Sequence, residues 1–492
     1  MLNSQSKKAK AGALVLAAAL TLTGCLPGGD KKSSPGGLDK DAQGSLKVAY
    51  FNEQAFFLQY GNAFQAMFPN VQLEVVSTES VFSNEDPVAG MEKLLEEQQP
   101  DALLLTQEQY AELAKKGLLY DLDAAIKQDE FDLEAFVPSV IELLKAEGGG
   151  KLYGLSPSFS SRALYYNKDL FDQHGIPYPT DGMSWEEAMQ LAARFPVKKD
   201  GEDALYGLFQ PSQTTNAFEL IRTIGEAKGL SYADAEAGTV TIDTPEWKGI
   251  FEAVVDGYQS GSISMPSQDG GTGGRVALMG AGGGRTFRIG GDSMRFMSGQ
   301  AAMAIDDSML MSLLGIGRQT GGASVSVSAA APADAEGGKG EVRPFKDIDW
   351  DVVTLPVDPS QPDVAGGMLL ENIFAIRASS ENTSAAWEFL KYANGEQLAR
   401  TNAMSATALS SRTAFKKQED GKNIDAFYAL EANVQPMLQN LPQGFEESFG
   451  KLASEHVVQA AEGTADLDEA IQAIQTQGQQ LLTEALADEG QP

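Results

Sequence analysis

Cysteine and histidine are almost absent from this chain of 492 residues, which has one cysteine and two histidines. A single cysteine cannot close an intrachain disulfide, and these residues are too few for a Cys/His zinc site. Catalysis of the Ser-His-Asp or Cys-His type would have to use His174 or His456. His174 lies in a turn-like stretch and His456 in a helical stretch, so we expect both to be structural. We expect no metal and no cofactor.

Basic residues are also scarce. Asp and Glu number 68 against 37 Lys and Arg, for a formal net charge of −31. Nucleic-acid recognition depends on clusters of Lys and Arg that neutralise phosphates, so this balance argues against a nucleic-acid partner. With 42% hydrophobic residues, the chain can nevertheless bury the cores of two or three domains or lobes.

No segment of the sequence has the roughly 18 consecutive apolar residues that predict a membrane-spanning helix. Residues 11–22 form a shorter apolar run after a lysine-rich start, the pattern of a secretory signal peptide. The run ends in Leu-Thr-Gly-Cys at 22–25, which resembles the bacterial lipobox in which the cysteine is acylated. We therefore expect a signal peptide at 1–24 and a lipid anchor at Cys25, on the extracytoplasmic face of the cell membrane.

The residues after the expected anchor are rich in Gly, Pro, Ser and charge. This composition predicts that 25–44, including the lipidated Cys25, is a flexible tether with a reach on the order of 25 Å. The folded part of the chain then begins near residue 45.

The folded part begins with strands that alternate with helices. The expected strands are 46–51, 71–76 and 101–105, and the expected helices are 54–67, 88–98 and 107–116. This spacing predicts βαβ units and a parallel sheet, with ligand-accessible loops at the carboxyl ends of the strands. Those loops begin near Asn52, Ser77 and Thr106.

Further helices and two unusual segments follow. A capping box at Ser184 opens one helix, Thr244-Pro245 opens another, and a 3–4 spacing of apolar residues predicts a C-terminal helix from Leu467. The glycine-rich segment 269–291 lacks the spacing of a phosphate-binding loop, so we expect a mobile surface loop. Residues 317–346, rich in Gly, Ala and Ser, are predicted to be a disordered insertion.

Several blocks resemble one family in the order that the family has them. The most specific block, at 150–195, contains GKLYGLSP, then YNKDLFDQHGIPYP, then a Trp-Glu-Glu helix. The other matching blocks are 64–70, 100–122, 296–305, 350–357 and 386–400. Together with the lipobox, they resemble the maltose-binding-type (family 1) extracellular solute-binding lipoproteins of ABC importers.

The resemblance implies an α/β, two-lobed periplasmic-binding-protein-like fold (type II) with a ligand cleft between the lobes. By the family pattern, hinge crossings are expected near 157–163, 302–307 and 376–380. Lobe 1 would comprise 45–157 plus 307–376, and lobe 2 would comprise 163–302 plus 380–492. The implied protein is a monomer and not an enzyme, and its partners are a small-molecule solute, the ABC transporter permease subunits and, through the lipid anchor, the membrane.

The resemblance also implies which residues contact the solute, because the family's cleft is lined by strand-end loops and hinge crossings. These residues are Asn52, Glu53, Thr106, Gln107, Phe159, Ser160, Asp306, Asp307, Gly367 and Met368. Alternatively, Asn52, Ser77 and Thr106 only cap the helices that follow them. For Asp306 and Asp307, either at least one faces the solute or both cap a helix that starts at Ser308.

Polar side chains of these types suit a hydroxyl-rich solute, most simply a carbohydrate or oligosaccharide. The sequence departs from many sugar-binding relatives because no Trp follows the strand at 301–305. Stacking on a sugar ring would have to come from one of five aromatic residues, which are Phe51, Phe56, Phe159, Tyr165 and Phe445. A cationic or peptide-like solute, a surface lipoprotein enzyme such as a glycosidase, and a sensory protein that has lost transport are alternatives.

The lipobox generates the first prediction. Replacing Cys25 by Ser should release the protein from membranes or leave it unprocessed, because a diacylated cysteine supplies the anchoring that a single acyl chain cannot. Membrane fractionation combined with mass analysis of the N-terminus measures both effects. A variant that stays in the membrane fraction with the wild-type processed N-terminus would contradict the lipoprotein interpretation.

Overall fold

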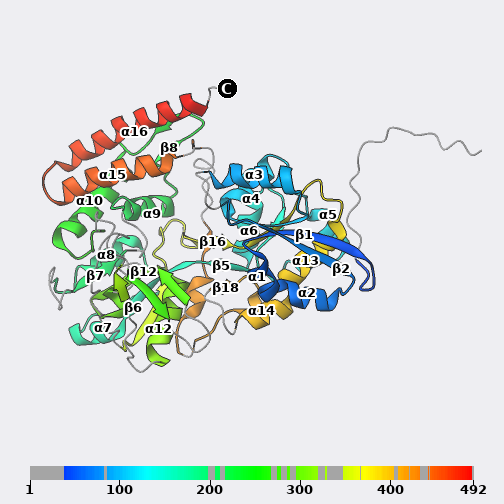
Figure 1. Cartoon of the computed structure of the whole chain (residues 1–492). Coiled ribbons are helices and arrows are strands. Elements are labelled where there is room, and N and C mark those ends of the chain that lie inside the picture. Colours follow the sequence, from blue (N-terminus) through cyan, green and yellow to red (C-terminus); the bar gives the residue numbers. More distant parts are fainter. Residues whose placement is uncertain are drawn as a thin grey trace, which may run out of the picture. The chain divides into compact units, whose positions relative to one another are not determined.

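The computed structural model describes residues 38–81, 86–197, 205–210, 216–266, 274–278, 285–288, 295–319, 327–329, 347–365, 367–403, 408–419, 421–432, 441–442 and 444–489. The expected signal peptide at 1–24 and Cys25 lie outside these ranges. Within them the chain forms two larger sheets, several smaller ones and the helices that pack on them (Figure 1).

The first larger sheet has five strands in the order β2-β1-β3-β17-β4. Its strands are β1 (Gly44–Tyr50), β2 (Val71–Ser77), β3 (Ala102–Leu105), β17 (Ile373–Ile376) and β4 (Gly154–Leu155). Strand β1 pairs in parallel with β2 and β3, whereas β17 runs antiparallel to β3 and β4. The parallel strands confirm the βαβ units that the alternating pattern predicts.

The helices around the first sheet bury their apolar faces in one core with it. They are α1 (Glu53–Phe56), the π-helical turn η1 (Phe57–Gly61), α2 (Asn62–Met67), α3 (Pro87–Gln98), α4 (Gln107–Lys115), α5 (Asp123–Gln128), α6 (Pro138–Glu147), α13 (Thr383–Ala393) and α14 (Glu396–Ala403). Phe389 of α13 lies with its ring centroid 5.5 Å from those of Phe64 and Phe374. Aromatic packing therefore joins the late helix α13 to elements from the start of the chain.

The second larger sheet has four strands in the order β14-β6-β12-β7. They are β14 (Trp350–Thr354), β6 (Arg162–Asn167), β12 (Ala301–Asp307) and β7 (Tyr206–Phe209). Residues alternate between two cores, so that Ala163 and Tyr165 join the core of the first sheet while Leu164 and Tyr166 join a second core. The second sheet is thus buried on both faces.

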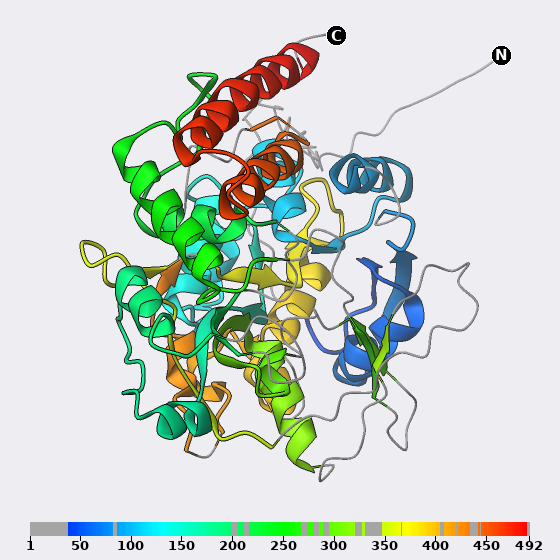
Figure 2. The ribbon, with the colours of Figure 1, turned by 90° about the vertical axis from the view of Figure 1, so that its left-hand side faces the viewer.

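Most of the remaining helices surround the second sheet. They are α7 (Lys168–His174), α8 (Trp185–Ala192), α9 (Glu219–Ala227), α10 (Pro245–Ser260), α12 (Ser308–Gln319), α15 (Phe445–Ala461) and α16 (Leu467–Glu489). The predicted capping box at Ser184 and the cap at Thr244 are both present, and the C-terminal helix α16 packs against α15 (Figure 2). The short elements are β8 (Ala233–Asp234), β9 (Thr239–Val240), β15 (Val364–Ala365), β19 (Glu431–Ala432) and the 3-10 turns η2 (Thr413–Phe415) and η3 (Ile424–Phe427).

A third, small sheet forms where the chain passes between the two larger ones. Its strands, in the order β16-β5-β18, are β5 (Ser158–Ser160), β16 (Leu369–Glu371) and β18 (Leu409–Ser410). β5 lies between β4 of the first sheet and β6 of the second along the chain. β16 lies between β14 and β17, and β18 lies between α14 and α15. In the described part of the chain, each of these three passages from one half to the other therefore contributes one strand to this sheet, which we call the crossing sheet.

The crossing sheet corrects two of the three expected hinges. The crossing expected near 157–163 coincides with β5, but 302–307 lies within β12, which pairs with β6 on one side and β7 on the other. The crossing expected near 376–380 occurs earlier, at β16. Apolar composition does not reveal these positions, because an internal strand and a buried crossing have the same kind of sequence.

The expected lobe ranges change accordingly. β14 belongs to the second sheet through its pairing with β6, although it falls within the range 307–376 expected for lobe 1. Conversely, α13 and α14 join the core of the first sheet, although they fall within the range 380–492 expected for lobe 2. Long-range pairing and packing, which local sequence patterns do not specify, decide these memberships.

The last residues of the expected tether 25–44 are held against the folded chain. Leu38 packs against the first core, and its backbone N–H donates to Glu388 Oε1 at 3.3 Å. Asn70 Nδ2 donates to the carbonyl oxygen of Asp41 at 3.1 Å. The flexible part of the tether is therefore expected to be shorter than its composition suggests.

The two segments expected to be loops contain strands. β10 (Gly274–Leu278) and β11 (Arg285–Arg288) lie within 269–291, and β13 (Val327–Ala329) lies within 317–346. β10 pairs antiparallel with both β11 and β13, which corrects the expectation for these residues. The β-branched and aromatic residues between the glycines favour strands. Much of both segments lies outside the described residues.

Close backbone packing beside the first crossing generates a stability prediction. A Cβ at Gly154 in β4 would lie 2.8 Å from Ile373 Cγ2 and 2.9 Å from the Phe374 carbonyl oxygen. Gly154→Ala should therefore lower the free energy of unfolding by about 1–3 kcal/mol, measured by urea denaturation. Gly249→Ala in α10 is the matched control, since its Cβ would meet nothing within 4 Å and should stabilise the helix slightly. Equal stability of the two variants would contradict this account.

Candidate functional site

Several of the predicted site residues lie at one edge of the first sheet. The register pairs Tyr50 with Ser77, so the parallel strands β1 and β2 end side by side. β17 runs in the opposite direction and pairs Ile373 with Leu105, which places the start of β17 beside the end of β3. The loops after β1, β2 and β3 and the junction of β16 with β17 therefore share this edge.

Asn52 and Thr106 act as helix caps at this edge. Asn52 Oδ1 accepts the Ala55 N–H at 2.9 Å, and its Nδ2 also donates to Glu79 Oε1 at 3.1 Å. Thr106 forms a capping box with Gln109 at the start of α4. The capping role weighed from the sequence is thus present for both residues, whereas Glu53 next to Asn52 is exposed.

Gln107 connects the first sheet's helices to the crossing sheet. Its Nε2 donates to Glu147 Oε1 at 2.8 Å, and its Oε1 accepts the Leu370 N–H at 3.1 Å. Burial raises the pKa of the Glu147 carboxyl, while the hydrogen bond from Gln107 opposes this shift. One amide side chain therefore fixes β16 to α4 and α6 at the point where the chain crosses.

Ser160 and Asp307 act on a carboxylate that the sequence did not single out, that of Glu371 in β16. The Ser160 side chain forms a hydrogen bond with Glu371. Burial raises the pKa of the Glu371 carboxyl, the charge of Asp307 raises it further, and the bond to Ser160 lowers it. A single carboxylate within the apolar strand sequence around 369–376 was the available signal for this residue.

Asp306 and Asp307 end β12 immediately before α12. Asp306 is buried and its Oδ1 accepts the Asp307 N–H at 2.9 Å, while Asp307 Oδ1 accepts the Met309 N–H at 2.8 Å. The Tyr165 hydroxyl donates to the Asp307 carbonyl oxygen at 2.7 Å. Asp307 therefore caps α12, whereas Asp306 accepts an N–H that precedes the helix, so only one of the two carboxylates has the capping role. It is also the charge of Asp307 that acts on Glu371.

Phe159 is fully buried and packs edge-on against Tyr428, with ring centroids 5.5 Å apart. It belongs to the core, which corrects its place among the expected solute contacts. Of the five aromatic residues considered for stacking, four are buried, and only Phe51 is exposed, at 47%. Phe51 directly follows β1 at the edge described above.

Gly367 and Met368 directly precede β16. Both residues pack against other parts of the folded chain. Gly367 has a φ of +100°, and a Cβ there would lie 3.1 Å from Arg162 Cδ. Glycine is therefore needed both for the backbone conformation and for the approach of Arg162. Met368 is buried in the first core, whereas the next residue, Leu369, is 54% exposed.

A pocket of about 580 Å³ opens beside these residues. Its lining includes Gln107 and Glu147 from the helices of the first sheet, Leu369 from the crossing sheet and Glu446 from the start of α15. Asn372 lies next to Glu371, is exposed and has a φ of +58°, a conformation that few non-glycine residues adopt. All but one of the lining residues come from α4, from α6 and the residues after it, or from the crossing sheet, and Glu446 is the group from the second half of the chain.

The second sheet contributes a further polar group that the sequence did not indicate. Gln210 directly follows β7 and is buried; its Nε2 donates to the Tyr258 hydroxyl and to the Ser264 carbonyl oxygen. Its Oε1 has no hydrogen-bond partner. β7 runs parallel to β12, so Gln210 lies at the same end of the second sheet as Asp306 and Asp307.

The described residues contain no group of three or more His, Cys, Asp and Glu side chains arranged to hold a metal ion. His174 lies at the end of α7, and His456 on α15 is 3.3 Å from Gln477. Among the helices that the structure describes, none is both long and apolar enough to cross a membrane.

Comparison with known proteins connects this geometry to a family. A family model described as bacterial extracellular solute-binding protein matches residues 59–432. Binding proteins of Brucella abortus (strain 2308) and Brucella suis biovar 1 (strain 1330) are each 29% identical over 164 residues, covering 32% of this chain. The match spans 37% of the length of these curated relatives.

Solved structures share the fold. A sugar transporter protein from Rhizobium etli, in an open conformation, has a TM-score of 0.61 and 18% identity, covering 89% of this chain and 99% of that chain. The sugar-binding protein MalE from Xanthomonas citri has a TM-score of 0.59 and 18% identity, covering 91% of this chain and 100% of that chain. At this identity the likeness establishes the fold alone, and it confirms the two-lobed periplasmic-binding-protein-like fold.

The environment of Glu371 generates a prediction about stability and pH. Because its pKa is raised in the folded chain, the folded state holds this proton more tightly than the unfolded state does. The stability that the proton contributes is present below the unfolded pKa of about 4.3 and is lost as pH rises through the folded pKa. Glu371→Gln should therefore raise the melting temperature at pH 7 and leave it unchanged near pH 4.

The measurement is a pair of thermal melts at the two pH values for each variant. Glu252→Gln, at an exposed position of α10, is the matched control and should melt with the wild type at both. A Glu371→Gln variant that is less stable than the wild type at pH 7 would show that the carboxylate stabilises the fold, contrary to this account.

Proposed function

Because the chain belongs to the bacterial extracellular solute-binding protein family, we propose that it captures a carbohydrate or oligosaccharide and delivers it to an ABC transporter. The solute lies in the cleft at the crossing sheet, between the two larger sheets. The observation that carries this proposal is the pocket at the crossing, which is bordered by residues from both halves of the chain.

The architecture supports a hinge mechanism. Among the residues that the structure describes, short strands of the crossing sheet join the two halves along the chain, so small backbone rotations there move one half relative to the other. A solute that contacts both halves binds the closed arrangement more tightly than the open one and shifts the equilibrium towards it. The transporter then recognises the closed, loaded form.

The groups at the crossing suit a hydroxylated solute. Asn52, Gln107 and Ser160 offer donors and acceptors that match sugar hydroxyls, and Glu371 and Asp307 offer acceptors. Phe51 presents an exposed aromatic ring beside them, which can pack against the apolar face of a sugar. No step of this function requires bond breaking, so the proposal includes no catalytic residue.

One observation favours a second candidate, a solute that carries an amine. Glu371 and Asp307 are close enough for their charges to repel. An ammonium group between them would relieve this repulsion through charge-assisted hydrogen bonds. An amino sugar satisfies both candidates.

The proposal extends to location and partners. Cys25 carries the lipid that holds the protein at the extracytoplasmic face of the membrane, and the protein works as a monomer with the permease subunits of the importer. The sequence resemblance to lipoprotein signals and the family of extracellular proteins support this part.

Ligand-induced closure tests the function. Adding malto-oligosaccharides, neutral disaccharides and amino sugars in turn should reveal one class that reduces the radius of gyration in X-ray scattering and binds in calorimetry. Glycoside turnover by the same preparation would support the enzyme alternative instead. Failure of every sugar to bind or to close the protein would overturn the carbohydrate proposal.

Asp307→Asn should weaken binding of the identified solute by roughly 1–3 kcal/mol, the range for a hydrogen-bonded polar group left poorly paired. Asp306→Asn is the matched control, because Asp306 is buried and its Oδ1 accepts from the backbone. If both folded variants bind with wild-type affinity in calorimetry, Asp307 does not contact the solute.

A further inference from the structure

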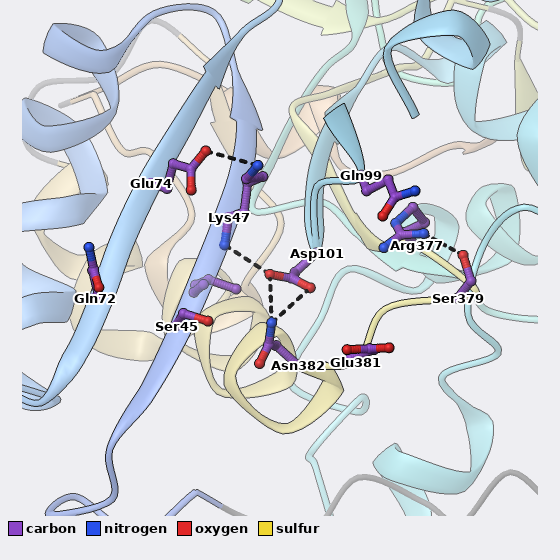
Figure 3. A pocket seen from close by; sticks show the side chains of 11 residues that line it. Ser45, Lys47, Gln72, Glu74, Gln99, Asp101, Arg377, Ser379, Glu381 and Asn382 are labelled. Atoms are coloured by element: carbon purple, nitrogen blue, oxygen red, sulfur yellow. Dashed lines mark hydrogen bonds and ion pairs between the residues drawn. The ribbon is translucent and has the colours of Figure 1, made fainter. Parts of the chain in front are cut away.

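A second pocket lies at the opposite edge of the first sheet, away from the cleft. It has a volume of about 530 Å³ and is lined by the start of β1, the start of β2, the end of α3 and the segment between β17 and α13 (Figure 3). The cleft lies at the carboxyl ends of β1, β2 and β3, whereas this pocket lies at their amino ends. The length of β1, which has seven residues at a rise of roughly 3.3 Å each, separates this pocket from the cleft.

The parallel register of β1 and β2 builds the floor of this pocket. Ser45 pairs with Gln72, and Lys47 pairs with Glu74. Side chains two residues apart on a strand point to the same face, so these four lie together on one face of the sheet. The floor is therefore polar and is already formed by the fold.

Most of the charges in the pocket are already matched. Lys47 Nζ lies 2.9 Å from Glu74 Oε1 and donates to the Gln98 carbonyl oxygen at 3.2 Å. Asp101 is buried and accepts from the Lys47 N–H and the Asn382 amide, as Figure 3 shows. It also accepts from the Ser380 hydroxyl. These groups form a rigid frame rather than free binding positions.

Two lining residues of opposite charge have no charged partner. Arg377 donates through Nε to the Pro100 carbonyl oxygen at 2.7 Å and through Nη1 to the Ser379 hydroxyl, both neutral acceptors. Within the described part of the chain, neither Arg377 nor Glu381 forms an ion pair. The hydrogen bond to Pro100 fixes the guanidinium while its Nη2 edge stays available.

Neutral groups complete the lining. The side chains of Ser45, Gln72 and Gln99 border the pocket and form no hydrogen bond within the described residues. The start of α13 also faces this segment, and its cap residue Asn382 donates to Asp101 instead of capping the helix.

We propose that this pocket binds a zwitterionic small molecule, an α-amino acid or a short peptide, whose carboxylate contacts Arg377 and whose ammonium group contacts Glu381. A neutral sugar would leave the charges of Arg377 and Glu381 without partners. A simple anion would be repelled by the Glu381 carboxylate. The amides of Gln72 and Gln99 would pair with the peptide group or a polar side chain. This site is independent of the solute cleft and of its proposed function.

The test uses the dipeptide Ala-Ala and its two singly blocked forms, N-acetyl-Ala-Ala and Ala-Ala amide, titrated by calorimetry and NMR. Ala-Ala should bind the wild-type protein in the millimolar range or tighter, and each blocked form should bind roughly tenfold more weakly. Glu381→Gln, at an exposed position, should weaken Ala-Ala roughly tenfold while leaving the affinity for N-acetyl-Ala-Ala unchanged. Arg377→Lys, which keeps the charge but loses the planar fork, should weaken Ala-Ala and not Ala-Ala amide.

A cleft variant, Gln107→Ala, is the matched control and should bind Ala-Ala like the wild type. No binding of Ala-Ala at millimolar concentration would overturn the proposal, and so would equal affinity for all three probes. Binding that is lost in Gln107→Ala but kept in Glu381→Gln would place the dipeptide in the cleft and would also overturn it. None of these outcomes bears on sugar binding at the cleft, which is measured separately.

Discussion

The pairing of three short strands in the crossing sheet is the constraint on which the rest of the site depends. β5 lies between β16 and β18, and each of these strands has only two or three residues. Within the described residues, three passages of the chain between the two halves go through this sheet. Its register sets where Ser160 and Glu371 lie, and the bond from Gln107 to the Leu370 N–H fixes the sheet to α4.

Two carboxylates in the structure, those of Asp101 and Glu371, have very different hydrogen-bonding environments. Asp101 is buried at the amino edge of the first sheet, where three donors from two segments, β1 and the loop before α13, surround it. Glu371 lies at the crossing, where Ser160 is its hydrogen-bond partner and Asp307 repels it. The hydrogen bonds to Asp101 stabilise the loop before α13. The Glu371 carboxylate, in contrast, can accept further hydrogen bonds, which a binding site for a donor-rich solute requires.

Local patterns predicted many of the elements. The alternation of apolar strands with capped helices at residues 46–116 led correctly to parallel βαβ units, and the caps at Ser184 and Thr244 start helices as expected. These features depend on neighbours within a few residues, which the sequence displays directly. The glycine-rich segments were misjudged because their composition masked short runs with strand propensity.

By itself, the sequence determined the fold class, the family and the polar residues at the strand ends. It did not determine which half each late segment joins. β14 belongs to the second half and α13 to the first, opposite to the expectation, because their partners, β6 and Phe64, lie far away along the chain. Nor did it show that Phe159 faces the core, or that the charge of Asp307 raises the pKa of Glu371. Only tertiary structure decides such features, because burial and electrostatic environment arise from contacts between segments whose separation in sequence carries no information about their distance in space.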